Sequence, residues 1–502
     1  MKINACSLNS DHQVVVKIIK ELFFLFRIEV DDACPDADYA LWEIRNERLP
    51  GHPVQVATTL VLDGKEELSM QGEGRSDEKE SAAEHRIIKL NLYRILRERF
   101  GFPPAPWGIL HGVRPTKIVH RWIRAGLGEQ DILARLQSDY ACSAGKAGLI
   151  VPMAFRQIPF LAASGEKTVS VYVGIPFCLT RCLYCSFPSH VLPGEKKIRE
   201  FMEALVKDIA AAKDAVKRYG FQVQNIYIGG GTPTSLPDSF FAEMMDLVYN
   251  AFYGADTAEF TVEAGRPDSM SPAKIACMKG HGVTRASVNP QTMQERTLRR
   301  IGRHHTPEAV LKMFHDLRAA GIPCINMDLI LGLPGETAAD VEDSVRKVLA
   351  LRPDDITLHA LALKHGSELK LRLDENENVE LPGDEETRRM SEVAMHCIRE
   401  AGMQPYYLYR QGYMSGHLEN VGCCRKGAES MYNIQIMEEH QTILGIGGAA
   451  ATKAVDFRAK RMKSAFHAKD LTTYLRDIDI YIEKRARLLE EAYGEQEERV
   501  SC

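Results

Sequence analysis

Short apolar runs alternate with longer helical patterns from about residue 168 to 362, and this alternation constrains the fold more than any other feature of the chain. The runs are apolar on both faces, which is typical of parallel strands that are covered by helices. We expect six such strands, at Ser170–Ile175, Asn225–Gly229, Phe260–Ala264, Arg285–Val288, Cys324–Ile330 and Ile356–Ala360. Six β/α units in sequence predict a parallel barrel or part of one, with functional groups at the carboxyl ends of the strands.

The segments between these runs carry apolar residues at helical spacing. Between the first two runs, those residues are Ile198, Phe201, Leu205, Ile209 and Val216. Gly220 follows them, where a C-terminal cap belongs. Further helices are expected at Pro237–Phe252, Ser271–His281, Pro307–Ala320 and Ala338–Leu351. The middle of the chain is therefore predicted to be a partial (β/α)6 barrel of the α/β class.

The pattern changes on both sides of this block. Residues 1–165 combine a strand pattern at Val54–Leu62, a turn at Asp63-Gly64 and helical patterns at Ala82–Phe100 and 116–138, which predicts an N-terminal α+β accessory domain. The acidic stretch Asp374–Thr387 is poor in apolar residues and is expected to be a solvated connector. We therefore predict three parts: this domain, a barrel over 166–373, and a C-terminal α/β extension over 374–502 that covers the substrate.

Composition excludes several classes of function. The 502 residues include 63 basic and 68 acidic side chains, so no global charge favours nucleic acid as a partner. The N-terminus is polar where a signal peptide is apolar, and the stretch from Val16 to Phe26 is too short and too charged to span a membrane. The twelve cysteines are mostly scattered singly, unlike a disulfide framework. We expect a cytoplasmic protein in which a tight cysteine cluster binds metal or takes part in catalysis.

Three cysteines stand close together directly after the first predicted strand. Cys178, Cys182 and Cys185 lie in the segment YVGIPFCLTRCLYCSF, with the spacing Cys-x3-Cys-x2-Cys. Three thiolates can hold three irons of a [4Fe–4S] cluster and leave the fourth iron open to a substrate or cosubstrate. Zinc is the alternative, but a structural zinc site needs a fourth ligand, and the nearest candidate is His190.

This cysteine spacing, with the aromatic Tyr184 before the third cysteine, resembles the signature of the radical S-adenosylmethionine (SAM) enzymes. The segments IPFC, GGGTPT and GLPG resemble the oxygen-independent coproporphyrinogen III oxidase branch of that family over roughly residues 168–450. The resemblance implies that the open iron is chelated by the amino and carboxylate groups of SAM. It also implies that one electron, from a donor such as flavodoxin or ferredoxin, cleaves SAM to a 5′-deoxyadenosyl radical.

Matching segments imply which residues bind SAM. The GGGTPT segment implies that Gly230, Gly231 and Thr232 contact the methionyl amino group. The segments RASVNPQ and INMDLILGLPGET imply that Gln291 and Asp328 bind the ribose. Glycines after a strand leave room for the backbone to approach a ligand closely, which agrees with the first of these roles.

The resemblance assigns three further side chains. Arg303, which follows Gln291 by twelve residues, matches the arginine that pairs with the SAM carboxylate, and a planar guanidinium suits that bidentate contact. Glu263 ends the third strand, where a carboxylate would face the barrel mouth and contact a ligand. Tyr172 corresponds to a tyrosine near the cluster and SAM. Tyr172 and Glu263 are therefore the predicted catalytic residues.

Two positions depart from the pattern of the branch. Its oxidases carry a fourth cysteine where this chain has Phe187, and a histidine where it has Gly174. The same phenylalanine is common in relatives that bind haem as chaperones. The predicted function is oxidative decarboxylation of coproporphyrinogen III to protoporphyrinogen IX by a radical SAM oxidoreductase of haem biosynthesis. A haem-binding chaperone and a radical SAM methyltransferase are the alternatives.

A porphyrinogen substrate carries four propionates, so its pocket should offer basic or amide donors beside a large apolar wall. The deoxyadenosyl radical would abstract a hydrogen from a propionate β-carbon, and loss of CO2 and one electron would leave a vinyl group. The glycines of ILGIGGAA indicate either a close backbone approach or a tight turn. Candidate donors and late thiols lie near the C-terminus: Tyr406, Tyr407, Arg410, Asn433, Lys453–Lys463 and Cys423-Cys424.

Overall fold

The structure is a computed structural model that describes residues 2–9, 13–30, 41–364, 366–375, 379–411, 418–457 and 461–494. The chain forms two compact units, Met1–Phe155 and Arg156–Cys502, which are described here one at a time. The finer division at residues 165 and 373 stays a prediction.

The first unit is built on a five-stranded sheet with the strand order β2-β1-β3-β4-β5. Strand β1 pairs in parallel with β2 and β3, and β3, β4 and β5 form an antiparallel meander. The predicted strand and turn are confirmed, because β4 ends at Leu62 and both Asp63 and Gly64 have the positive φ of a two-residue hairpin turn. The strands are Lys2–Asn9 (β1), Glu29–Val30 (β2), Leu41–Leu49 (β3), Gln55–Leu62 (β4) and Lys65–Glu73 (β5).

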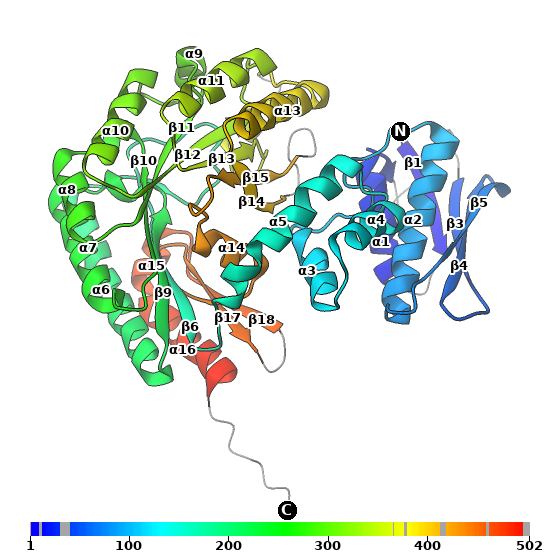
Figure 1. The fold of residues 1–502 in the computed structure, drawn as a ribbon, viewed down its shortest axis with the longest axis horizontal. Helices are drawn as coiled ribbons and strands as arrows, with labels where there is room; N and C mark the ends of the chain where they lie inside the picture. Colours follow the sequence, from blue (N-terminus) through cyan, green and yellow to red (C-terminus); the bar gives the residue numbers. More distant parts are fainter. Residues whose placement is uncertain are drawn as a thin grey trace, which may run out of the picture. The chain divides into compact units, whose positions relative to one another are not determined.

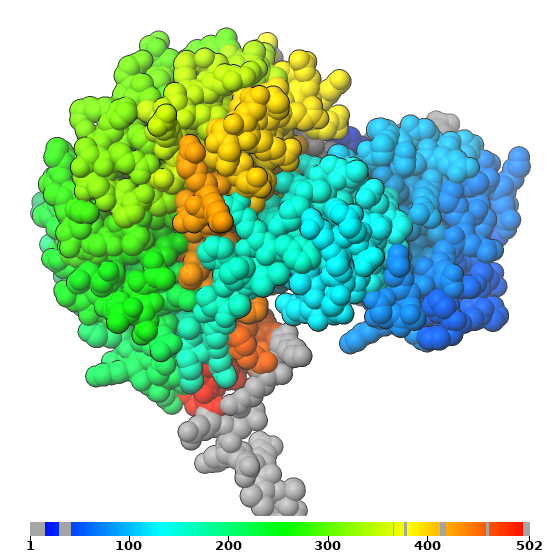
Figure 2. All heavy atoms as spheres, in the orientation of Figure 1, coloured from blue at the N-terminus to red at the C-terminus, as the bar shows by residue number. Residues whose placement is uncertain are grey.

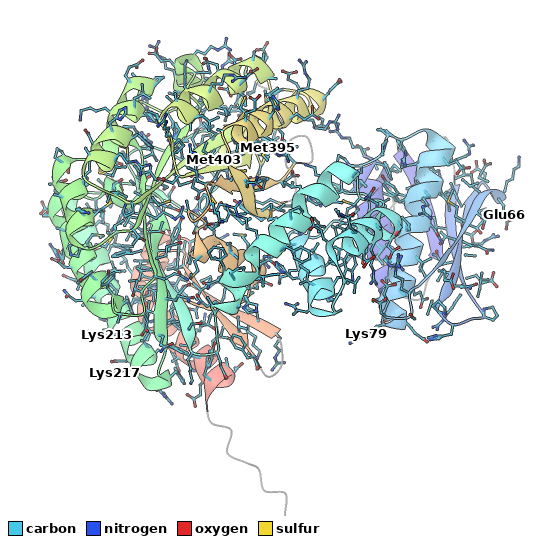
Figure 3. The ribbon with its side chains drawn as sticks, viewed as in Figure 1. Glu66, Lys79, Lys213, Lys217, Met395 and Met403 are labelled. Carbon is cyan, nitrogen blue, oxygen red and sulfur yellow. The ribbon has the colours of Figure 1, made fainter. Side chains whose placement is uncertain are left out.

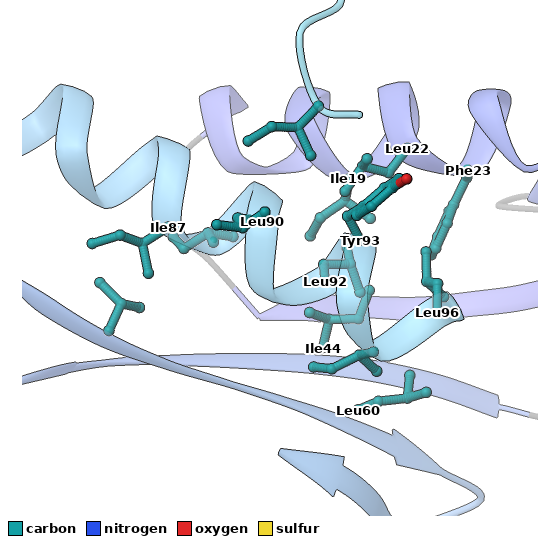
Figure 4. Close-up of a cluster of buried hydrophobic side chains, with 14 of the residues drawn as sticks. Ile19, Leu22, Phe23, Ile44, Leu60, Ile87, Leu90, Leu92, Tyr93 and Leu96 are labelled. Atoms are coloured by element: carbon teal, nitrogen blue, oxygen red, sulfur yellow. The ribbon is translucent and has the colours of Figure 1, made fainter. Parts of the chain in front are cut away.

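Two helices, α1 (Gln13–Leu25) and α2 (Glu80–Phe100), supply most of the apolar core of this unit. Figure 4 shows side chains of both helices facing those of the sheet, among them Leu22, Tyr93 and Leu60. The helix predicted over 116–138 is wrong as a single helix. It is two helices, α3 (Thr116–Arg124) and α4 (Glu129–Tyr140), because Gly126 takes a left-handed conformation that ends the first.

The second unit contains an eleven-stranded sheet with the order β14-β15-β13-β12-β11-β10-β9-β6-β16-β17-β18. All six predicted strands are present, and each pairs in parallel with its neighbour. They are Thr168–Ile175 (β6), Gln222–Gly230 (β9), Glu259–Gly265 (β10), Arg285–Gln291 (β11), Cys324–Leu331 (β12) and Asp355–Ala360 (β13). The predicted α/β class with a partial (β/α)6 barrel is confirmed.

Helices follow these strands and lie along the outer side of the sheet, where they form a continuous surface (Figures 1 and 2). In α6 the predicted apolar stripe is buried except for Val216, which is half-buried, whereas Lys213 and Lys217 point away from the strands (Figure 3). Gly220 caps α6 in the predicted left-handed conformation. The helices are Glu195–Tyr219 (α6), Asp238–Phe252 (α7), Pro272–Gly280 (α8), Glu295–Arg300 (α9), Pro307–Ala319 (α10) and Ala338–Ala350 (α11).

Five further strands extend the sheet on both sides. The segment ILGIGGAA contains all but the first residue of β16, which pairs in parallel with β6, and β17 and β18 continue the sheet as antiparallel strands. At the other edge β15 is antiparallel to β13, and β14 to β15. The bounds are Gln404–Tyr409 (β14), Asn420–Cys424 (β15), Thr442–Gly447 (β16), Ala451–Asp456 (β17) and Arg461–Phe466 (β18).

The predicted acidic connector is helical at both ends. Helix α12 ends at Asp374. Helix α13 begins at Asp384, where acidic side chains in the first turn interact favourably with the helix dipole. Residues 376–378 lie outside the described part. No helix among the described residues is both long and apolar enough to cross a membrane. The remaining elements are Ala144–Ala162 (α5), Phe177–Cys178 (β7), His190–Val191 (β8), Glu368–Asp374 (α12), Asp384–Glu400 (α13), Met431–Glu438 (α14), Leu471–Arg476 (α15) and Ile478–Tyr493 (α16).

Candidate active site

One cavity of about 360 Å³ lies at the carboxyl ends of the parallel strands. This is the position that the β/α pattern predicts for functional groups, and the volume falls within the range of small-molecule sites. The cavity gathers ten of the eleven predicted site residues, and Tyr172 is not part of its lining. The ten are Cys178, Cys182, Cys185, Gly230, Gly231, Thr232, Glu263, Gln291, Arg303 and Asp328.

The cysteine-bearing loop after β6 is held from two sides. The backbone N–H of Leu183 donates to the carbonyl of Ile301 at 3.1 Å, and the N–H of Leu369 donates to the carbonyl of Leu183 at 2.9 Å. The Leu183 side chain packs against an apolar cluster that contains Ile301 and Leu369. Arg181 adds a bond of 2.6 Å from its Nη2 to the carbonyl of Gly366. The loop that carries the three thiols is therefore fixed by backbone contacts and apolar packing.

The donor set fits an iron–sulfur cluster. The three thiols line one cavity. Three thiolates can each hold one iron of a [4Fe–4S] cluster and leave the fourth iron open. His190, the candidate fourth ligand for zinc, is not part of the lining, and its Nε2 accepts a bond from the N–H of Leu471 at 3.2 Å.

Gly231 keeps space open beside the first cysteine. A Cβ at this position would lie 3.1 Å from Cys178 Sγ and 2.5 Å from the carbonyl oxygen of Phe177. The neighbouring Thr232 hydroxyl is 3.6 Å from the same sulfur. Burial raises the pKa of the Cys185 thiol. The GGGTPT segment thus contacts the cysteine loop directly, and only glycine fits at its third position.

Arg303 is buried and held in a fixed orientation. Its Nη1 donates to the carbonyl of Asn289 at 2.5 Å, and its Nη2 donates to the Tyr184 hydroxyl at 3.0 Å. Its Nε has no partner among the described residues. Burial lowers the pKa of Arg303, but Tyr184 and Cys182 outweigh that effect, so the pKa lies above its usual value. A buried, permanently charged guanidinium with an unused donor is suited to bind an anionic group such as a carboxylate.

Gln291 ends β11 in a left-handed conformation, with φ of +67°. Residues with a Cβ rarely adopt this conformation, and it is concentrated at functional sites. The side chain lines the cavity and is only 8% exposed, yet its Oε1 has no partner in the described chain. An unpaired buried amide oxygen is costly unless a ligand satisfies it. The position therefore suits a ligand contact.

Sequence reasoning missed two other residues on the same strand. Ser287 and Asn289 line the cavity, and Ser287 Oγ and Asn289 Oδ1 have no partner within the described residues. With Gln291 they occupy alternate positions of β11, so all three face one side of the sheet. That alternation was the signal in the sequence that could have found them.

Asp328 lies on the next strand in a polar row. Its Oδ1 accepts a bond of 2.7 Å from Asn326 Nδ2 and lies 3.8 Å from His359 Nε2. Asn326 in turn accepts a bond of 3.1 Å from the Thr357 hydroxyl. These contacts fix the Asp328 carboxylate against β13 and leave it facing the cavity.

The carboxyl group of Glu263 accepts hydrogen bonds from the neighbouring strand β9. Oε1 accepts a bond of 2.7 Å from the Tyr227 hydroxyl, and Oε2 accepts one of 3.2 Å from the N–H of Gly230. Burial raises the pKa of Glu263 to about 7, and the hydrogen bond from Tyr227 opposes that rise. The ring of Tyr227 stacks between Tyr172, with centroids 6.0 Å apart, and Tyr432, at 4.5 Å. The ring of Tyr227 therefore connects Tyr172 to the Glu263 carboxyl group.

Comparison with known proteins identifies the family of this chain. The model of the radical SAM superfamily matches residues 172–348. The oxygen-independent coproporphyrinogen-III oxidase-like protein HemZ of Bacillus subtilis is 38% identical over 396 residues, which cover 77% of each chain. The chain belongs to the HemZ-like branch of the radical SAM superfamily.

Other members of the superfamily share parts of the chain. The haem chaperone HemW of Bacillus subtilis is 29% identical over 283 residues, covering 56% of this chain and 70% of that protein. The solved structure of coproporphyrinogen III oxidase HemN from Escherichia coli, a radical SAM enzyme, has a TM-score of 0.53 at 23% identity and covers 65% of this chain and 72% of that one. This structural likeness shows that the radical SAM fold is shared.

The two departures from the oxidases of the oxygen-independent coproporphyrinogen III oxidase branch, Gly174 and Phe187, have different structural settings. A Cβ at Gly174 would lie 2.6 Å from the carbonyl oxygen of Gly448, so the turn after β16 occupies the space that a histidine would need. Phe187, in contrast, is 63% exposed and lines the cavity. The first change is fixed by packing, whereas the second places an apolar ring at the cavity surface.

The candidate substrate donors divide into two groups. Tyr407 and Asn433 line the cavity, together with Arg181, Lys364 and Gln411, which sequence reasoning missed. The others are not part of the lining. Tyr406 donates to Asp355 in a buried network, and Cys423 and Cys424 are buried in β15. The basic run Lys453–Lys463 lies on β17 and β18, apart from Phe457, which is in a turn, and residues 458–460, which the structure does not describe.

The pKa of Glu263 predicts a pH-dependent contribution to stability. A carboxyl whose pKa is raised from 4.5 to about 7 favours folding while it is protonated. Its contribution is complete below pH 4.5 and is lost as the pH rises through about 7. We expect the unfolding temperature, measured by circular dichroism between pH 5 and 8 without SAM, to fall less steeply with rising pH in Glu263→Gln than in the wild type. Glu203→Gln, an exposed change on α6, should keep the wild-type slope. Equal slopes in all three proteins would contradict this assignment.

Proposed function

We propose that this protein catalyses the oxygen-independent oxidative decarboxylation of coproporphyrinogen III to protoporphyrinogen IX. The observation that carries the proposal is the convergence of ten predicted cluster and SAM residues on one cavity that also contains basic and amide side chains. Its basic and amide donors include Arg181, Lys364 and Gln411. Apolar groups such as Leu361 and Met437 line the same cavity. This combination is what a large ring with propionate arms requires.

The cavity residues are assigned to the two cofactors by their chemistry. When bound, a [4Fe–4S] cluster and SAM supply a one-electron reduction and a radical that abstracts hydrogen. The three thiolates would hold the cluster, and the guanidinium of Arg303 would bind the SAM carboxylate. Gln291 and Asp328 would bind the ribose hydroxyls. The methionyl amino group would be held by Gly230, Gly231 and Thr232.

The chain's own contribution is mainly positioning. Holding the reacting groups in a fixed geometry supplies a large part of a catalytic acceleration. Glu263 presents a carboxyl whose orientation is fixed by Tyr227 and Gly230, and near neutral pH it exists in both protonation states. We assign Glu263 as a catalytic residue on this basis. Tyr172 would act on Glu263 indirectly, because its ring stacks on that of Tyr227.

The reaction that these residues would support balances as follows. Each reacting propionate loses a hydrogen atom from its β-carbon, then CO2 and one electron, and becomes a vinyl group. The hydrogen goes to the deoxyadenosyl radical, and the electron goes to a one-electron acceptor. A donor such as flavodoxin or ferredoxin would reduce the cluster. Lys364, whose pKa is lowered by burial, and Arg181 are two of the cationic groups that line the cavity, together with Arg266 and Arg303.

Haem binding is a second candidate function, and Phe187 favours it. This ring is 63% exposed at the cavity, where it could pack against a porphyrin face. The haem chaperone HemW of Bacillus subtilis is 29% identical to this chain over 283 residues. A haem-binding protein would keep the same scaffold without decarboxylating the propionates.

A product assay separates the two functions. Protein reconstituted anaerobically with iron and sulfide would be supplied with a reductant, SAM and coproporphyrinogen III. We expect vinyl products, and one CO2 and one 5′-deoxyadenosine for each vinyl group formed. The Cys185→Ala variant measures background without an intact cluster site. SAM consumption without CO2 or vinyl product would refute the oxidase, and tight haem binding without turnover would support the chaperone.

A further inference from the structure

A buried hydroxyl–carboxyl pair begins at the residue that follows Gln291 in the chain. The Thr292 hydroxyl donates to Glu336 Oε1 at 2.6 Å, and both residues are buried. Glu336 belongs to the segment between β12 and α11, whereas Thr292 follows β11. Neither residue lines the cavity. The pair therefore joins two loops at the carboxyl ends of adjacent strands without contacting the ligand space.

The same segment is held at the next two residues. The Thr292 hydroxyl oxygen accepts a bond of 3.1 Å from the N–H of Gln294, and Ser344 Oγ accepts one of 3.1 Å from the N–H of Met293. Ser344 Oγ is also 3.3 Å from Thr292 Oγ1. Residues 292–294 are thus tied to α11 and to the loop before it.

Gln291 immediately precedes this anchored segment, and its backbone is the strained one. The left-handed conformation is unfavourable for a residue with a Cβ and persists only where surrounding contacts impose it. The register between β11 and β12 also shifts between Val288 and Gln291. After residue 294 the chain enters α9, which leads to Arg303. The anchor therefore lies between two residues to which we assign SAM contacts.

We propose that Thr292 and Glu336 are positioning residues that hold the backbone of Gln291 in its left-handed conformation and so aim its amide into the cavity. This inference rests on the proposed SAM contact of Gln291. It concerns SAM binding alone, so it does not depend on which porphyrinogen chemistry follows.

The surroundings of Glu336 agree with a role as a fixed acceptor. Burial raises its pKa to about 7, and hydrogen bonds from Thr292 and Thr297 oppose that rise. Asp340 raises the pKa further, whereas Arg296 lowers it. An acceptor is what the Thr292 hydroxyl needs, and a glutamine carbonyl supplies one as well. Glu336→Gln should therefore bind SAM about as tightly as the wild type, whereas Glu336→Leu should not.

The test is a double-mutant cycle read by SAM affinity. Equilibrium dialysis of radiolabelled SAM with the anaerobically reconstituted full chain would give the dissociation constants. We expect Thr292→Val to weaken binding about tenfold, because Gln291 relaxes, and Thr292→Ser, which keeps the hydroxyl, to stay within about twofold of the wild type. Gln291→Gly should weaken binding by about the same factor, because the amide is lost.

The decisive comparison is Thr292→Val in the Gln291→Gly background. Glycine adopts the left-handed conformation freely and has no amide to aim, so the valine change should add less than about twofold. If it adds its full factor, or if Gln291→Gly or Thr292→Val alone leaves SAM affinity unchanged, the proposal is overturned. If the four SAM affinities agree with these expectations but the protein makes no vinyl product, only the oxidase function is refuted.

Two controls separate positioning from general damage. Glu342→Gln, on the exposed face of α11, should leave SAM affinity unchanged, since Glu342 pairs with Arg346. Iron content and the unfolding temperature of each variant would be measured in parallel. A loss of iron in Thr292→Val that matches its loss of SAM binding would also overturn the proposal, because the effect would then pass through the cluster.

Discussion

Replacing Cys182 with alanine is expected to remove nearly all bound iron from the reconstituted protein. Cys182 is buried, and the guanidinium of Arg303 lies beside it in the cavity wall. In a cluster with three protein ligands, each thiolate holds one iron, so losing one leaves too few bonds to retain the rest. The wild type should bind about four irons per chain and show broad charge-transfer absorption, and the variant should show neither.

Cysteines elsewhere in the second unit provide the matched control. Cys277 lies on α8 and Cys324 at the start of β12, and neither lines the cavity. Alanine at either position should leave the iron content and the absorption spectrum unchanged. Cys178→Ala and Cys185→Ala should behave like the Cys182 variant. Retention of about four irons by all three cavity variants would show that the cluster is held elsewhere.

The barrel strands could be predicted because their sequence pattern is local. Each is a short run that is apolar on both faces, and helices before and after it are marked by spacing and caps. Strand β16 carries no such mark. Its Gly445 and Gly447 lower strand propensity, and they are needed because a Cβ at Gly447 would lie 2.3 Å from the carbonyl oxygen of Gly174. The glycines of this segment indicate a close backbone approach as one alternative, but its partner Gly174 is far away in sequence, so the local pattern does not identify the contact.

The candidate site could likewise be predicted only in part. Residues in segments that resemble a known family, such as Cys178 and Gln291, could be predicted from sequence to lie at one site, and both line the cavity. Tyr227 and Tyr432 could not, because a strand tyrosine and a helix tyrosine are ordinary packing residues until the fold stacks them. Thr292 likewise has no signature of its own, since its role depends on a carboxyl that another strand brings close. A family resemblance implies which residues bind a cofactor, whereas the residues that orient them are found only in three dimensions.

The late strands and helices are joined to the barrel by a buried polar network centred on Asp208 of α6. Asp208 Oδ1 accepts a bond of 2.7 Å from Arg485 of α16, and Oδ2 accepts one of 2.8 Å from the N–H of Gly447 in β16. The Tyr474 hydroxyl donates to Oδ2 at 3.1 Å. Asp208 and Arg485 are both buried, so each charge depends on the other for compensation.

Asp208→Ala is therefore expected to lower the free energy of unfolding by about 3–5 kcal/mol, because it leaves the Arg485 guanidinium buried without its partner. Urea unfolding followed by circular dichroism would measure the loss. The double variant Asp208→Ala with Arg485→Met should recover part of it, because it removes the uncompensated charge while keeping apolar volume. Asp479→Ala, whose side chain is 82% exposed, should change the free energy by less than about 0.5 kcal/mol. A loss below about 1 kcal/mol in Asp208→Ala would mean that α16 and β16 are held by apolar packing rather than by this ion pair.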